Sequence, residues 1–246
     1  MEGPGVLVIK RRLSFLIGSK VIAIVGNSKT PKEVLLNRTL TDIFSQGKEL
    51  FLVFDDVAVR IHFLMYGSYS INREREGKVP RISATFMMPE GKEVCVNFYN
   101  TSVRFLASAA LPVNSSVDIL SEKFDIRQAV ERIKSSPRII SDILLDQSAF
   151  AGVGNIIKNE ALFLAKIHPE NVGFKIPEEM ASELVNKILF FSKVFLEFRQ
   201  KNRRLREVLT VYNRKYCPLC GGRISIKYIG ESRRRTFYCN SCQILY

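Results

Sequence analysis

Four cysteines near the C-terminal end of the sequence have the spacing of a metal site. They form two Cys-x2-Cys pairs separated by eighteen residues: Cys217 and Cys220, then Cys239 and Cys242. Two such pairs at this distance are typical of tetrahedral zinc, which takes two thiolates from each pair. We therefore expect one structural zinc ion, and we keep two disulfides or free thiols as the alternative. Cys95 stands alone in a strand-like run, which favours a small core residue.

The segment between the two cysteine pairs predicts a β-hairpin. Apolar residues alternate at Ile224, Ile226 and Tyr228, and Thr236 to Tyr238 form the returning strand. A module of this size has little core, so bound zinc must supply much of its folding free energy. Zinc ribbons also join proteins to proteins, but the three arginines at 233 to 235 favour contact with phosphates.

Residues 146 to 160 form the densest motif of the chain. Gly152 and Gly154 allow a tight turn between two helices, and Asn155 is placed to begin the second helix. Free backbone amides at a helix N-terminus bind anions, so this turn can hold a DNA phosphate. An ordinary helix-turn-helix corner with a glycine cap is the alternative.

A strongly basic composition indicates a polyanionic partner. The 246 residues carry a formal net charge of +13, with many basic residues between 193 and 235. Such a surface attracts nucleic acid and releases counterions on binding, although a basic, ribosome-like protein has the same composition. No apolar stretch approaches the about 20 residues of a membrane span, and the N-terminal residues do not resemble a signal peptide. We expect no membrane association, and a location in the cytoplasm with the nucleoid of a prokaryote or in the nucleus of a eukaryote.

Two regions of different periodicity must position these residues. Residues 6 to 17 have nearly helical apolar spacing, and short strand-like runs follow. The candidate strands are Lys20 to Val25, Glu49 to Phe54, Ala58 to Met65, Arg81 to Met87, Glu93 to Tyr99 and Val103 to Ala107. Several short strands at this spacing predict a sandwich or barrel.

The second half of the chain is helical up to the cysteine module. Residues 112 to 116 are typical of a linker, and helical periods follow at Ile126 to Lys134, Pro137 to Leu145, Gly154 to Ala165 and Pro177 to Arg206. The last of these is one long helix or two. We expect an α+β multidomain protein with domains at 1–112, 121–208 and 209–246: a β-sandwich with a leading helix, a helical domain and a zinc ribbon.

Three motifs in this order resemble the Fpg/Nei family, the formamidopyrimidine-DNA glycosylases and endonucleases VIII. Gly-Val-Gly-Asn-Ile-Ile-Lys-Asn-Glu-Ala-Leu-Phe at 152–163 resembles the family's helix-two-turn-helix signature. Residues 234–243 resemble its zinc finger, and Glu2-Gly3-Pro4 resembles its catalytic N-terminus. The motifs span nearly the whole chain. Their form is most similar to the vertebrate endonuclease VIII-like branch that prefers single-stranded DNA.

The resemblance implies catalytic roles for Met1, Glu2, Lys48 and Arg234. Family members attack C1′ of the damaged nucleotide with the α-amine of the first residue, usually proline, and that position here is Met1. An α-amine has a pKa of about 7.7–8.0, so part of it is neutral and nucleophilic near pH 7. Glu2 matches the carboxylate that moves protons during ring opening and elimination. Lys48 and Arg234 match residues that contact phosphates around the lesion, although a turn lysine is otherwise an ordinary solvated residue.

The resemblance also implies a set of DNA contacts: His62, Met65, Tyr66, Arg104, Asn155 and Lys158. Met65 is the candidate wedge that fills the gap left by a flipped base, although methionine in a strand is also typical of a core. Residues 99 to 105 match a loop in which many relatives carry an arginine for the orphaned base. Val103 occupies that position, which favours single-stranded or open DNA. Ser148 replaces a lysine of Fpg-type enzymes, which argues against 8-oxoguanine as the main substrate.

The sequence therefore predicts a bifunctional DNA glycosylase and AP lyase of base excision repair. It is expected to act as a monomer on oxidised pyrimidines and hydantoins, through a Schiff base and β-elimination, with a structural zinc ion and no organic cofactor. A non-catalytic protein that binds damaged or single-stranded DNA is the main alternative, because Met1 replaces the usual proline. A zinc-ribbon module for protein interaction is a third.

Overall fold

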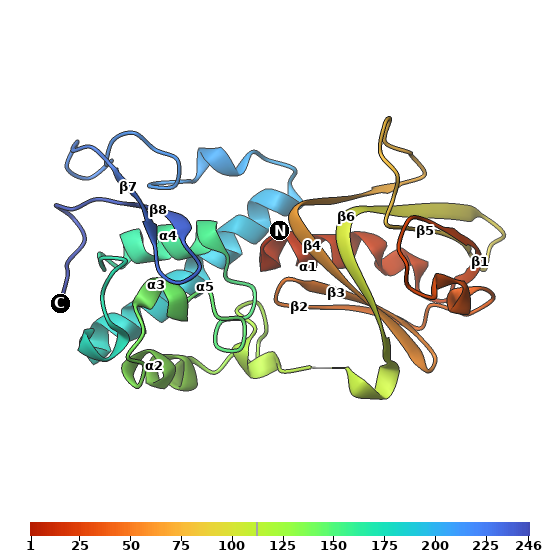
Figure 1. Ribbon diagram of the computed structural model, residues 1–246, viewed down its shortest axis with the longest axis horizontal. Helices are drawn as coiled ribbons and strands as arrows, with labels where there is room; N and C mark the ends of the chain where they lie inside the picture. Colours follow the sequence, from red (N-terminus) through yellow and green to blue (C-terminus); the bar gives the residue numbers. More distant parts are fainter. Residues whose placement is uncertain (112) are drawn as a thin grey trace. The chain divides into compact units, whose positions relative to one another are not determined.

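The chain divides into two compact units in the computed structural model, which describes residues 1–111 and 113–246 (Figure 1). The first unit contains Met1 and Gly5–Val113, and the second contains Glu2–Pro4 and Asn114–Tyr246. The boundary falls within the expected linker, of which Pro112 lies outside the described residues. The helices and the cysteine hairpin, which we expected as two domains, both lie in the second unit. The expected mixed α+β class is confirmed.

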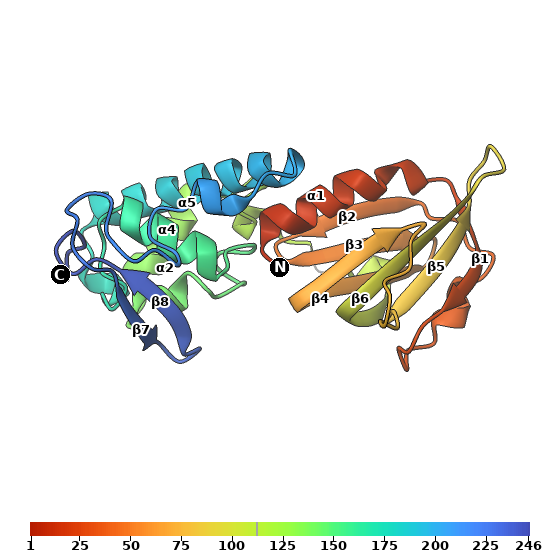
Figure 2. The same ribbon diagram turned by 90° about the horizontal axis from the view of Figure 1, so that it is seen from above.

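A helix that begins at Gly3 leads into the first unit. This helix, α1 (Gly3–Leu13), starts and ends a few residues earlier than its apolar spacing predicts, and the 3-10 turn η1 (Ser14–Leu16) follows it. Val6, Ile9 and Leu13 recur on one face of α1 and are buried in the core of the unit, as an amphipathic helix requires. Figure 2 shows α1 running along the sheet.

Six antiparallel strands form one continuous sheet in the order β1-β5-β6-β4-β3-β2. Their bounds are β1 (Lys20–Val25), β2 (Asp42–Gln46), β3 (Glu49–Phe54), β4 (Val57–Ile71), β5 (Ile82–Met87) and β6 (Glu93–Ala107), with the 3-10 turns η2 (Lys32–Leu35) and η3 (Ser108–Ala110). The long strands β4 and β6 belong to both halves of the sheet. The start of β4 pairs with β3, whereas the start of β6 pairs with β5. The expected sandwich is therefore one continuous sheet whose two halves share the strands β4 and β6.

A wide bulge interrupts the pairing of β4 with β6. Phe63 pairs with Thr101 and Ser68 with Tyr99, so residues 64–67 lie opposite Asn100 alone. The sequence predicts a strand end near Met65 and a loop at 99–105; instead both strands continue past the bulge. Gly67 is required here, because a Cβ atom would lie 2.8 Å from the Cα of Phe63. Such bulges bend a sheet and change where its side chains point.

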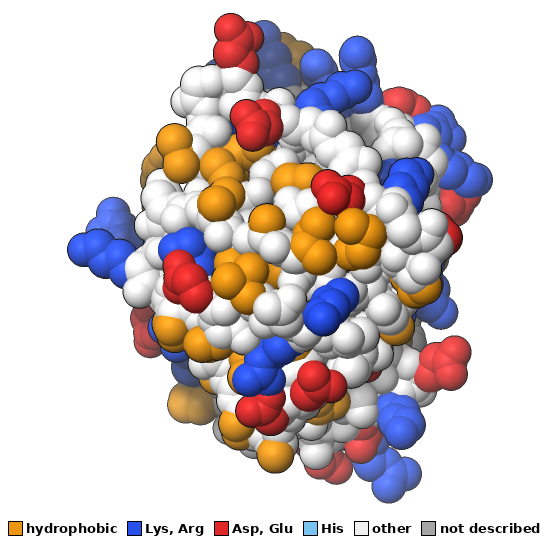
Figure 3. All heavy atoms as spheres, turned by 90° about the vertical axis from the view of Figure 1, so that its right-hand side faces the viewer, with side chains coloured by type: hydrophobic (Ala, Val, Ile, Leu, Met, Phe, Trp, Pro, Cys, Tyr) orange, Lys and Arg blue, Asp and Glu red, His pale blue; other side chains and the backbone are white. Residues whose placement is uncertain are grey.

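The end of the sheet at β1 exposes Ile22 and Val25 of that strand, and Val34 and Leu36 of the segment that follows it. Residues 37–40 of this segment form hydrogen bonds with the start of β1 and cover part of its outer edge. Figure 3 faces this end and shows apolar groups intermixed with basic and acidic ones. Charged residues at an edge strand oppose pairing with other chains.

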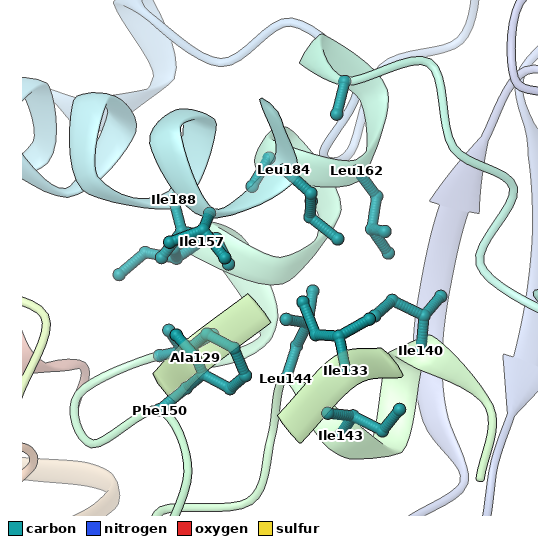
Figure 4. Close-up of a cluster of buried hydrophobic side chains, with 14 of the residues drawn as sticks. Ala129, Ile133, Ile140, Ile143, Leu144, Phe150, Ile157, Leu162, Leu184 and Ile188 are labelled. Atoms are coloured by element: carbon teal, nitrogen blue, oxygen red, sulfur yellow. The ribbon is translucent and has the colours of Figure 1, made fainter. Parts of the chain in front are cut away.

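The second unit packs its helices around one core (Figure 4). They are α2 (Ile126–Lys134), α3 (Ile140–Ile143), α4 (Asn155–Leu164) and α5 (Glu178–Gln200), with the 3-10 turns η4 (Ser115–Val117), η5 (Gly173–Lys175) and η6 (Leu205–Glu207). Ile133 of α2, Ile157 of α4 and Ile188 of α5 are fully buried there. The predictions for α2 and α4 are confirmed, α3 is shorter than predicted, and α5 is one long helix.

The cysteine module forms the predicted hairpin of β7 (Ser225–Ile229) and β8 (Arg234–Tyr238). A small apolar cluster of Phe163, Val211, Ile224 and Phe237 joins this hairpin to α4. None of the helices among the described residues is long and apolar enough to cross a membrane.

Candidate functional site

The α-amine of Met1 is fixed against strand β4 of the first unit. It donates hydrogen bonds to the backbone carbonyls of Phe63 at 3.0 Å and Leu64 at 3.3 Å. These residues lie where β4 leaves its register with β6. The Met1 side chain packs on the core of the unit, and Gly5 leaves room for it, because a Cβ atom at Gly5 would lie 2.8 Å from Met1 Cγ. The amine therefore has a defined position beside the bulge.

The bulge presents apolar side chains to solvent. Met65 is 68% exposed, Tyr66 is 81% exposed, and Leu64 is also exposed. The alternative that Met65 is a core residue is therefore wrong. An extended apolar side chain next to a fixed amine matches the position expected of a wedge that enters a DNA stack.

A pocket of about 300 Å³ opens on the same sheet, lined by Glu49, Arg60, His62, Leu64, Ser102 and Arg104. Cross-strand register places His62 between Glu49 and Ser102, and places Arg60 opposite Arg104. Glu49 forms an ion pair with Arg60, whereas no ion pair of Arg104 is found among the described residues. The pocket therefore contains more positive than negative charge and can accept an anion.

Burial lowers the pKa of His62, and the Met1 amine, Lys48 and Arg60 lower it further, while Glu49 opposes them. The imidazole is thus predominantly neutral near pH 7. Lys48 lies in the short turn between β2 and β3, where Gly47 adopts a φ of 54°. His62, Lys48 and the amine are therefore close enough to influence one another's charge.

In the second unit, the Glu2 carboxylate binds the N-terminus of α4. Its two oxygens accept hydrogen bonds from the backbone amides of Ile156 at 2.7 Å and Ile157 at 3.2 Å. We call these two amides the Glu2 seat. Free amides and the helix dipole at this end both favour a bound anion. We expected this helix end to bind a DNA phosphate; instead, the protein's own carboxylate fills it.

The glycines of the motif are explained by this close approach. A Cβ atom at Gly154 would lie 2.3 Å from Glu2 Cγ. Gly152 adopts a φ of 101°, and its carbonyl accepts a hydrogen bond from the amide of Gly3 at 3.0 Å. The two glycines thus allow residues 2 and 3 to pack against the turn before α4.

Three side chains of α4 hold strand β8. The Asn155 amide nitrogen donates to the carbonyl of Arg235 at 2.8 Å, Lys158 Nζ donates to Thr236 Oγ1 at 2.8 Å, and Asn159 Oδ1 accepts from the amide of Phe237 at 2.7 Å. Arg234 begins β8 and is exposed. The contacts fix this arginine relative to the helix that carries the Glu2 seat.

Asn155 and Lys158 differ from the DNA contacts that we expected. The Asn155 side chain uses its donor on a backbone carbonyl, and its oxygen is buried with no hydrogen-bond partner among the described residues. Lys158 has no exposed surface, so its ammonium does not reach a phosphate in this structure. Burial lowers the pKa of Lys158 to about 8, against the opposing effect of Asp142 and Glu2.

No role for Asn159 or Glu160 was predicted from the sequence. Glu160 is fully buried and accepts hydrogen bonds from the backbone amides of Thr210, Val211 and Tyr212 at 2.8 to 3.1 Å. It therefore anchors the chain where the cysteine module begins. The sequence does contain a sign of these buried roles. Residues 158–160 are three consecutive polar residues in α4, a helix that buries the faces on which they lie.

The four cysteine sulfurs lie within 4.8 Å of one another. Cys217 and Cys242 are 3.8 Å apart, and Cys220 and Cys239 are 3.5 Å apart. A disulfide needs about 2.05 Å. A tetrahedral zinc ion with Zn–S bonds of about 2.3 Å separates its sulfurs by about 3.8 Å, so the cluster fits zinc. It is the only group of three or more such ligands found within 1–111 and 113–246.

Val103 lies in β6, where it pairs with Ile61 and is buried in the core. The loop that we expected at this position is strand, so residue 103 points away from solvent. The neighbouring Arg104 is exposed and lines the pocket.

Known proteins that are similar to this chain carry names of the Fpg and endonuclease 8-like group. The model of the formamidopyrimidine-DNA glycosylase H2TH domain matches residues 116–204. Endonuclease 8-like 3 of Mus musculus is 36% identical over 203 residues, covering 80% of this chain and 33% of the relative. Formamidopyrimidine-DNA glycosylase of Cytobacillus firmus is 29% identical over 274 residues, covering 99% of both chains. The chain spans only about a third of the mouse relative's length.

Solved structures share the fold at low sequence identity. The Lactococcus lactis Fpg protein in complex with THF-DNA and an inhibitor has a TM-score of 0.86 at 23% identity, covering 99% of this chain and all of that chain. A viral DNA glycosylase has a TM-score of 0.85 at 23% identity, with the same coverage. The similarity extends over both units, each with its own candidate residues.

Proposed function

Since the chain belongs to the Fpg/Nei family, we propose that it is a DNA glycosylase with AP lyase activity that removes oxidised bases. The observation that carries the proposal is the pair of adjacent residues Met1 and Glu2. The amine of the first is fixed by two carbonyls, and the carboxylate of the second by two amides. A nucleophile followed directly by a proton carrier is what this chemistry needs.

In the proposed reaction the neutral Met1 amine attacks C1′ of the damaged nucleotide. The base leaves with the electrons of the glycosidic bond and takes up a proton. The amine loses its protons as the sugar ring opens, and the ring oxygen gains one, which leaves an imine between Met1 and C1′. Loss of a proton from C2′ then expels the 3′ phosphate, and water hydrolyses the imine. We assign these proton transfers at the sugar to Glu2.

The surroundings of each group suit its task. The Phe63 and Leu64 carbonyls accept hydrogen bonds from the amine and hold it in one orientation. The Glu2 seat stabilises a carboxylate by two hydrogen bonds and the helix dipole. Glu2 is therefore ready to accept a proton once the amine has attacked.

DNA binding is proposed for the exposed cations and the bulge. The pocket with His62 and Arg104 fits a phosphate oxygen, and Lys48 and Arg234 add positive charge in their respective units. Met65 is proposed to replace the flipped base in the stack, with Tyr66 beside it. Each of these DNA contacts is assigned to a side chain that is at least partly exposed or carries positive charge. Lys158 is fully buried and is given no DNA contact.

We propose single-stranded or open DNA as the preferred substrate, bound by a monomer. The support is the likeness of the motifs to the endonuclease VIII-like branch that prefers single-stranded DNA. In addition, the buried Val103 offers no donor to a base left unpaired in the opposite strand. A single strand has no such base and less stacking to break. Matched single-stranded and duplex oligonucleotides with one hydantoin test this, and faster single-turnover cleavage of the duplex would contradict it.

Zinc is proposed to bind Cys217, Cys220, Cys239 and Cys242. When bound, it supplies cross-links between the two ends of the hairpin module. The module carries Arg234 on β8, so these thiolates support the position of that arginine.

Borohydride trapping on an oligonucleotide with one abasic site tests the activity. The reagent reduces an imine to a stable amine, so the unmodified chain should become covalently attached to DNA. A single residue with a blocked α-amine added before Met1 should abolish the adduct, whereas one added after Tyr246 should not. Intact-mass measurement establishes that Met1 carries the free amine. DNA binding without an adduct would instead indicate a non-catalytic binder of damaged DNA.

A further inference from the structure

We propose that Lys158 is a positioning residue for Glu2, a buried cation that keeps the Glu2 carboxylate ionised in its seat and connects that seat to the strand carrying Arg234. The inference rests on the proposed function, in which Glu2 moves protons. It assigns Lys158 to the catalytic machinery of the second unit through its charge and its hydrogen bond, without contact to the substrate.

Helix geometry directs Lys158 toward the Glu2 seat. The seat consists of the amides of Ile156 and Ile157, and Lys158 is the next residue of α4. Side chains in an α-helix lean toward its N-terminus. The Lys158 side chain is fully buried, so it lies within the protein beside the first turn and not in solvent.

A short hydrogen-bonded chain leads from Lys158 to the start of β8. Lys158 Nζ donates to Thr236 Oγ1 at 2.8 Å, and Thr236 Oγ1 donates to the carbonyl of Arg234 at 2.9 Å. Thr236 is itself fully buried. The ammonium therefore fixes the backbone of the residue whose guanidinium is exposed for DNA.

Lys158 faces three described charged groups: Asp142 from α3, Glu2, and Arg234 from β8. The Asp142 carboxylate is buried and accepts the amide of Glu231 at 3.1 Å. A buried ammonium is stable only near opposite charge, and two carboxylates supply it here. Burial and Arg234 lower the pKa of Lys158 to about 8, so the residue still carries its charge at neutral pH.

A positive charge near two carboxylates favours their ionised forms. Without it, the Glu2 carboxylate would bind a proton at higher pH. A lysine that only filled space would have no such effect on Glu2. The two roles therefore differ in how Glu2 titrates.

The test compares Lys158→Met and Lys158→Arg in the full chain, with Lys193→Met as control. Lys193 is an exposed lysine of α5, so its loss changes the net charge equally at a solvated site. The titration midpoint of Glu2 is read from the side-chain carboxyl carbon by NMR, with Glu2→Gln identifying the signal.

Lys158→Met should raise the Glu2 midpoint by about one pH unit, in the range that a neighbouring charge produces. Lys158→Arg should restore most of the shift, and Lys193→Met should leave the midpoint unchanged. If Lys158→Met does not fold, Thr236→Val serves as the test instead. This variant removes the hydroxyl that accepts the hydrogen bond of Lys158 Nζ, so the Glu2 midpoint should shift in the same direction. An unshifted Glu2 midpoint in the variant that folds would overturn the proposal. The NMR readout needs no activity, so it stays informative even if trapping fails.

Discussion

Replacing Gly154 with alanine should displace the Glu2 carboxylate from its seat. Gly154 has φ −118° and ψ −166°, which alanine adopts without strain. The added Cβ atom, however, would lie 2.3 Å from Cγ and 2.4 Å from Cδ of Glu2. The substitution therefore acts through one contact, and the flexible Glu2 side chain is the group that must move.

The magnitude follows from the hydrogen bonds that are lost. Glu2 accepts two from the helix amides, and a hydrogen bond to a charged group contributes about 1.5–3 kcal/mol. Water replaces part of this for a carboxylate that swings out, so we expect the free energy of unfolding to fall by roughly 2–4 kcal/mol. Loss of a placed proton carrier typically lowers the chemical rate by about 10²–10⁴-fold.

A double-mutant cycle isolates the effect. Denaturant unfolding and single-turnover cleavage are measured for Gly154→Ala, Glu2→Ala and the double variant, with fluorescence anisotropy as a check on DNA affinity. In the Glu2→Ala background the alanine at 154 has nothing to displace, so its cost should nearly vanish. Equal losses from Gly154→Ala in both backgrounds would refute the reasoning, since the contact would then not be the cause.

Four further predictions concern other parts of the chain. Cys239→Ser should lower the zinc content from about one ion per chain to none, measured by atomic emission, and retention of zinc would contradict the proposed ligand set. Arg234→Ala should weaken DNA binding and reduce the slope of log affinity against log salt by about 0.7–0.9, whereas an unaltered slope would remove this arginine from the phosphate contacts. Val103→Arg should lower the free energy of unfolding by about 3 kcal/mol or more, because the charge would enter the core; normal stability with gained duplex activity would show that residue 103 reaches DNA. Between about pH 8 and the ordinary lysine pKa of 10.5, unfolded Lys158 binds a proton that the native residue has released. The free energy of unfolding relative to Lys158→Met should therefore rise with pH by about 3 kcal/mol in urea titrations, and a flat difference would exclude the lowered pKa.

The periodic spacing of apolar residues predicted much of the fold, because this spacing follows which side chains are buried. The strand period identified β1, β3 and β5 within one residue, and the helical period identified α2 and α4. The same method ended β4 at Met65, since exposed apolar residues in a bulge break the alternation that marks a strand. It also divided β6 at residues 100–102, where Asn100 adopts a φ of 50° opposite that bulge.

The site was predicted less completely, because its key contacts join distant parts of the chain. Cysteine spacing is local and identified the metal cluster. By contrast, Glu2 and Ile156 are 154 positions apart, so the turn at 152–154 gave no sign that its anion is an internal carboxylate. Lys158 presented the same difficulty, because a lysine in a basic protein is ordinarily solvated and only the packing of β8 on α4 buries it.

The long separation between Glu2 and its seat also bears on how the protein matures. Residues 2–4 are synthesised well before the rest of their unit, which begins at Asn114. They can dock only after α4 has been synthesised, and contacts of such high order form slowly. A nascent or half-folded chain therefore lacks the seated carboxylate, even when its sheet is complete. On the proposed function, the proton carrier is therefore in place only after the second unit has folded.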